Sequence, residues 1–95
     1  MNDAEARLIA NALCEIRLIM SAYIGSSVEA PTDVRFAAHL AYALHNEALA
    51  LAAGTGFDVN SALNKVAAID GILGTDDGRR LAGLWSAGSK INSQV

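Results

Sequence analysis

The polar residues of the stretch RFAAHLAYALHNE (35–47) have the side chains best suited to chemistry in this sequence. At about 100° per residue, four of them fall on one narrow stripe of a helix, and a second histidine flanks this stripe. The stripe consists of Arg35, His39, Tyr42 and Asn46, and the flanking residue is His45. A narrow polar stripe is typical of the water-facing side of a mostly buried helix, and this interpretation is favoured over a chemical role.

The two histidines do not have the spacing of a metal site. Zinc-binding helices place two histidines four residues apart, which brings both onto one face. Here His39 and His45 are six residues apart, so their side chains point about 120° apart on the helix. The sequence therefore predicts no metal ion, and no motif indicates another cofactor.

The stretch LAYALHNEAL (40–49) resembles the helix that carries the phosphoacceptor histidine in two-component histidine kinases. In that family the histidine is followed by an acidic or amide residue, as His45 is followed here by Asn46, but the proline that commonly comes next is missing. HLAYA, around His39, similarly resembles a histidine-phosphotransfer domain, but the lysine and glycine expected after the histidine are missing here. These resemblances imply a signalling domain that uses His45 or His39, which stays open as an alternative function.

Two acidic residues interrupt apolar helix faces. Glu47 and Asp70 project among apolar neighbours, and a buried carboxylate is costly unless it has a partner. Arg17 is the expected partner of Glu47, and Arg79 or Arg80 that of Asp70. The favoured interpretation is an ion pair at a helix edge. The alternative is a perturbed carboxylate in a pocket, as in a small-ligand-binding domain with Glu47 and Arg17 at its mouth.

The sequence lacks the combination of groups that an enzyme needs. Cys14 lies on the polar side of its helix, and a base from another helix would be needed to activate its thiol. No acid, base and nucleophile can be named that converge, and no glycine-rich phosphate loop follows a strand. We therefore expect a protein that is not an enzyme.

Glycine and proline divide the chain into four segments with helical periodicity. We expect helices at about 3–24, 31–53, 58–73 and 75–89, and no strands. Short connections favour antiparallel neighbours. The predicted fold is an all-α, four-helix antiparallel (up-down) bundle, one domain over residues 1–95, built on a long hairpin of the first two helices.

The first two segments have the strongest apolar patterns. Eight apolar residues of the first segment share one arc, which we expect to face the core: Leu8, Ile9, Ala12, Leu13, Ile16, Ile19, Met20 and Tyr23. The second segment is apolar on most sides, so we expect it to be the central helix or to lie at the interface of a homodimer.

Composition excludes several classes of protein. The chain is 53% hydrophobic and 18% charged, with net charge −3 and no basic run, which argues against disorder and against nucleic-acid binding. Polar residues interrupt every apolar stretch before a membrane-spanning length, and the acidic start is unlike a secretory signal. With one cysteine, a cytoplasmic location is expected. The leading hypothesis is a small helical interaction module that binds itself or a protein partner.

Overall fold

The computed structural model describes residues 2–25 and 29–86, and all regular structure in these ranges is helical. The elements are α1 (Asp3–Ile19), the 3-10 helix η1 (Met20–Tyr23), α2 (Thr32–Ala43), α3 (His45–Ala53), α4 (Val59–Leu73) and α5 (Asp77–Ser86). The all-α prediction is confirmed. The range 3–24 holds α1 and η1, and the predicted helix at 75–89 corresponds to α5, with its last residues, 87–89, outside the described ranges.

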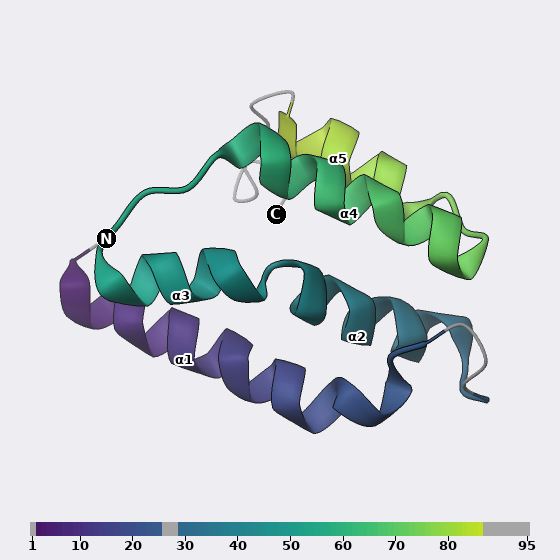
Figure 1. Cartoon of the computed structure of the whole chain (residues 1–95), viewed down its shortest axis with the longest axis horizontal. Coiled ribbons are helices and arrows are strands. Elements are labelled where there is room, and N and C mark those ends of the chain that lie inside the picture. Colours follow the sequence, from purple (N-terminus) through teal and green to yellow (C-terminus); the bar gives the residue numbers. More distant parts are fainter. Residues whose placement is uncertain (1, 26–28, 87–95) are drawn as a thin grey trace, which may run out of the picture.

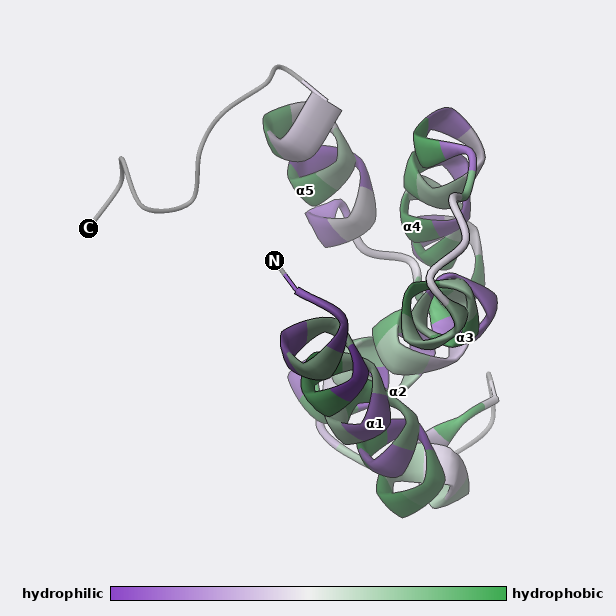
Figure 2. Cartoon of the chain, turned by 90° about the vertical axis from the view of Figure 1, so that its left-hand side faces the viewer, coloured by the Kyte–Doolittle hydropathy of each residue, from purple (hydrophilic) through white to green (hydrophobic). Residues whose placement is uncertain are grey.

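The helices lie in layers (Figure 1). The helix α1 packs along α2 and α3, α4 lies across α2 on the other side, and α5 packs on α4. Each turn of the path reverses the direction of the chain, so neighbouring layers run in opposite directions. Viewed from the side, α1 and α5 lie on one side of the molecule and α3 and α4 on the other (Figure 2).

The segment expected as one helix at 31–53 is two helices. The backbone N–H of Leu44 donates to the carbonyls of Leu40 and Tyr42, which ends α2. The next helix, α3, begins at His45, and its N-cap residue Leu44 has no side chain that could accept a hydrogen bond. Neither proline nor glycine marks this break, although these residues are the usual sequence signals of one. The described chain therefore has five α-helices where four were expected.

The ends of the other helices follow from capping residues that the sequence displays. The side chain of Asn2 accepts from the Glu5 N–H at 2.8 Å, and Glu5 accepts from the Asn2 N–H at 2.8 Å, which completes a capping box. Asp58 caps α4 by accepting from two N–H groups of its first turn. Gly54 and Gly74 end α3 and α4 in the left-handed conformation, which glycine adopts without strain.

The core consists mostly of small side chains. Its buried apolar residues are Ala6, Ala10, Phe36, Ala38, Ala48, Ala62, Val66 and Ile69. The expectation that the large apolar arc of the first helix faces the core is wrong: Leu8 is 69% exposed and Ile19 is 65% exposed. The helix α1 instead turns Ala6 and Ala10 inward, because small side chains let it pack closely against α3.

The described helices give no sign of a membrane span. None of them combines the length and the apolar composition that crossing a bilayer requires.

Candidate functional site

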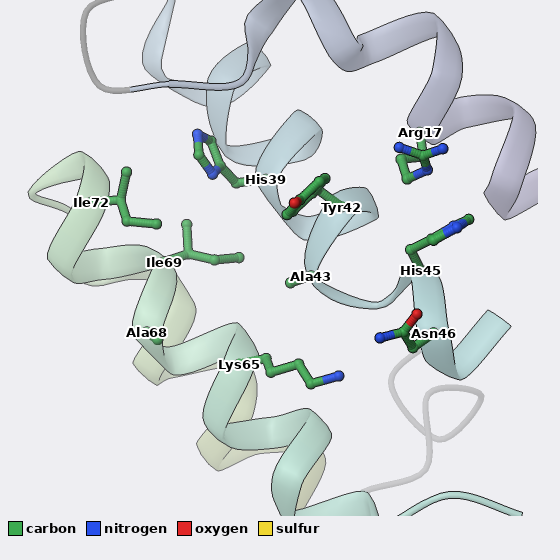
Figure 3. A pocket seen from close by; sticks show the side chains of 10 residues that line it. All are labelled: Arg17, His39, Tyr42, Ala43, His45, Asn46, Lys65, Ala68, Ile69 and Ile72. Atoms are coloured by element: carbon green, nitrogen blue, oxygen red, sulfur yellow. The ribbon is translucent and has the colours of Figure 1, made fainter. Parts of the chain in front are cut away.

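A cleft of about 570 Å³ lies between α4 and the junction of α2 with α3 (Figure 3). We call it the Arg17 cleft, because Arg17 of α1 contributes to its wall. Its other lining residues are His39, Tyr42, Ala43, His45 and Asn46 from α2 and α3, and Lys65, Ala68, Ile69 and Ile72 from α4. The break at Leu44 places the two histidines on separate helices that line the same cleft.

Most of the predicted polar stripe reaches this cleft. His39, Tyr42 and Asn46 line it together with His45, while Arg35 does not. The members differ in burial: Tyr42 is 57% exposed, whereas His39 is only 6% exposed. The interpretation of the stripe as a uniformly water-facing surface therefore fails at His39.

His39 and Arg35 hold the turn that follows η1. The Gly25 N–H donates to Nε2 of His39 at 3.1 Å, and Nη2 of Arg35 donates to the Gly25 carbonyl at 2.8 Å. Gly25 has a φ of 122°, a conformation that favours glycine. Since Nε2 must accept, His39 is neutral with its proton on Nδ1. Burial lowers the pKa of His39, and the charge of Arg35 lowers this pKa further.

His45 faces Cys14 on α1. The Nδ1 atom of His45 lies 3.9 Å from Sγ of Cys14, and both residues are half-buried. The sequence indicated that Cys14 would need a base from another helix, and α3 brings an imidazole to it. This contact was not predicted, because it joins residues 31 positions apart. The His45 ring lies at the end of the cleft nearest α1 (Figure 3).

Arg17 lies in the cleft wall without the ion pair that the sequence predicted for it. It was expected to pair with Glu47, but no ion pair joins Arg17 to an acid among the described residues. Its Nε atom is buried and has no hydrogen-bond partner in this part of the chain. A buried donor without an acceptor is costly, and Arg17 carries this cost as a residue of the cleft wall.

The two predicted buried carboxylates are both paired. Oε2 of Glu47 lies 2.6 Å from Nζ of Lys65, so α4 rather than α1 supplies its partner. Asp70 is 6% exposed and lies 3.9 Å from Nε of Arg79, as one of the two predicted pairings requires. Neither acid lines the Arg17 cleft.

Asp70 accepts hydrogen bonds in addition to its ion pair with Arg79. It accepts from the Thr75 hydroxyl at 2.6 Å and from the backbone N–H groups of Gly78 and Arg79 at 2.8 Å each. Burial by itself raises the pKa of Asp70, but these hydrogen bonds, led by that of Thr75, and the charge of Arg79 together lower this pKa. Asp70 thus anchors the first turn of α5 to α4.

A second cavity, of about 320 Å³, is lined almost entirely by apolar side chains. Its wall includes Leu13 of α1, Leu44 and Leu51 of the α2–α3 segment, Phe57 of the turn before α4, and Trp85 of α5. Leu44 lines this cavity and is half-buried. Among the described residues, six exposed large apolar side chains lie on α1 and two, Tyr42 and Leu49, on the 31–53 segment.

The described residues do not gather three His, Cys, Asp or Glu side chains where they could hold a metal ion. Comparison with known proteins gives no relative: no family model, no curated protein and no solved structure matches this chain. Any function must therefore be argued from the surfaces and the cleft themselves.

Proposed function

We propose that this chain is a small interaction module that forms a homodimer through the apolar face of α1. This face consists of Leu8, Ile9, Leu13, Ile16 and Ile19. All five side chains are exposed, and they lie on one side of a single helix. Soluble monomers rarely expose an apolar patch larger than a few hundred Å², and larger patches mark interaction sites.

The composition of the core supports the same conclusion. The largest fully buried side chain of the described residues is that of Val66, and most other buried apolar residues are alanines. A core of this kind stabilises a small chain weakly, because each large side chain that leaves water contributes about 1.5–3 kcal/mol. Burying the apolar face of α1 against a second copy would supply the missing contribution.

The pattern of α1 suits an antiparallel pair of identical helices. Ala12 is exposed and lies in the middle of the apolar face, where a small side chain lets two helices approach closely. With a two-fold axis at Ala12, Leu8 of one copy lies opposite Ile16 of the other. A two-fold axis makes the same patch serve both copies, as most homodimers require.

The patch extends beyond α1. Leu13 belongs both to the apolar face and to the wall of the apolar cavity, and Phe57 and Val59 of that wall are also exposed. A second copy seated on α1 would therefore also reach the mouth of this cavity.

We further propose that the fold is a four-helix antiparallel bundle in a single domain, in which α2 and α3 together take the place of one helix. We also propose that the module works in the cytoplasm, where its single cysteine stays reduced.

Phosphotransfer through His45 or His39 receives no support from a specific contact. Nε2 of His39 already accepts the Gly25 N–H, and the ring of His45 is half-buried against Cys14. The exposed row of large apolar side chains on α1 is the observation that most directly supports self-association.

Cysteine cross-linking tests the antiparallel pairing. In a Cys14→Ser background, Ala12→Cys places a thiol on the proposed two-fold axis, and mild oxidation should give a covalent dimer rapidly at micromolar protein. Asn11→Cys in the same background is the matched control, because residue 11 lies about 100° away on the helix. Equal cross-linking rates for the two variants would contradict the proposed pairing.

A further inference from the structure

The Arg17 cleft has the size and the graded chemistry of a small-molecule site. Its volume of about 570 Å³ falls within the range of ligand pockets. Arg17, His45 and Asn46 lie toward one end, and Ile69 and Ile72 of α4 lie toward the other, where His39 of α2 also lies (Figure 3). The aromatic ring of Tyr42 lies between the two ends.

The polar end presents positive charge that no ion pair among residues 2–25 and 29–86 neutralises. Lys65 is paired with Glu47, and Arg79 and Arg80 are paired with acids of the α4–α5 turn and of α5. Arg17 has no such pair among the described residues, and its Nε is buried without an acceptor. The two Nη atoms of a guanidinium can donate together to two oxygens of a carboxylate or phosphate.

The neighbours of Arg17 favour an oxyanion as well. The amide of Asn46 can donate, and the ring of His45 is held beside the guanidinium by its contact with Cys14. Glu47, which follows Asn46 in the sequence, has one oxygen bound to Lys65 and belongs to the wall of the apolar cavity instead. Among the described residues no carboxylate lines the cleft, and the acid that lies against its wall, Glu47, is paired with Lys65.

We propose that the Arg17 cleft binds a small oxyanion that carries an apolar group. Arg17 holds two oxygens of the anion, Asn46 and His45 donate to it, and the apolar group lies on Tyr42, Ile69 and Ile72. Carboxylates and phosphate monoesters share this chemistry. The site is independent of the self-association proposed for α1, because the apolar face and the cleft share no residue.

Calorimetric titration tests the site with phenyl phosphate, benzoate and inorganic phosphate as probes. We expect saturable binding of phenyl phosphate or of benzoate, and which of them binds more tightly assigns the anion. Inorganic phosphate should bind more weakly than phenyl phosphate, because it leaves the apolar end empty. Absence of binding by both aromatic probes up to 10 mM would overturn the proposal.

Substitutions locate the binding. Arg17→Gln should weaken binding at least tenfold. Arg17→Lys keeps the charge but loses the paired donors, so its affinity should lie between those of the wild type and Arg17→Gln. Arg7→Gln, at an exposed position of the same helix, is the control and should bind as the wild type does. Tyr42→Ala should weaken phenyl phosphate and leave inorganic phosphate unchanged. Circular dichroism verifies the fold, and unaltered affinity in a folded Arg17→Gln would overturn the assignment.

Discussion

Acidification should destabilise this protein through His39 well before it protonates the carboxylates. In the folded chain Nε2 of His39 accepts the Gly25 N–H, and burial together with Arg35 lowers the pKa of His39. The unfolded chain binds this proton near the ordinary pKa of 6.5. Between this value and the lower folded-state pKa, the unfolded state binds more protons, so the free energy of unfolding falls as pH falls.

The size of the effect has an upper limit. A proton bound by the unfolded chain alone lowers the free energy of unfolding by about 1.4 kcal/mol between pH 8 and pH 5.5. Protonating His39 in the folded state removes the acceptor of the Gly25 N–H, and a buried donor without a partner costs about 1–3 kcal/mol. The folded chain therefore resists this proton, and stability should fall between pH 8 and pH 5.5 by an amount that stays below this limit.

Urea denaturation between pH 5.5 and pH 8, at one protein concentration, measures this loss. His39→Gln keeps an acceptor for the Gly25 N–H but does not titrate, so its stability should vary less with pH. His45→Gln is the matched control and should keep the part of the slope due to His39. The reasoning fails if His39→Gln and the wild type have the same pH dependence in this range.

Two further predictions concern the contact of α4 with α5. Asp70→Asn places amide protons against N–H donors of the first turn of α5. We therefore expect a lower Tm and faster trypsin cleavage after Arg79. Asp76→Asn, at an exposed position, is the control and should change both quantities less. Gly78→Ala should destabilise the fold, because its Cβ would overlap the Val66 carbonyl; Gly83→Ala, which meets open space in the same helix, should instead stabilise by about 0.5–1 kcal/mol. Equal melting temperatures for the two alanine variants would show that α5 does not lie so close to α4.

Local signals in the sequence were sufficient to predict most of the helix ends. Capping residues act within one helical turn, so residues close in sequence are enough to predict their effect. This holds for Asn2 with Glu5, Asp58, Gly54 and Gly74. The break at Leu44 was not predicted, because it has neither glycine nor proline. Both sides of the break keep helical periodicity, so no local pattern in the sequence marks it.

The orientation of α1 could not be predicted from periodicity alone. One side of this helix has large apolar residues and another has Ala6 and Ala10, and both are compatible with burial. Hydrophobicity favoured the large residues, whereas close packing against α3 selected the small ones. The contact of Cys14 with His45 and the isolation of Arg17 depend on this orientation, so the sequence could supply the polar stripe but not the cleft.

Sedimentation equilibrium across a dilution series tests the proposed dimer most directly. The wild type should have the mass of two chains at micromolar concentration, and Ile9→Glu should have the mass of one. Leu49→Glu is the control: Leu49 is 49% exposed on α3, as Ile9 is 48% exposed on α1, and this variant should remain a dimer. A wild type that has the mass of one chain at every concentration, or an Ile9→Glu variant that remains dimeric, would contradict self-association through α1.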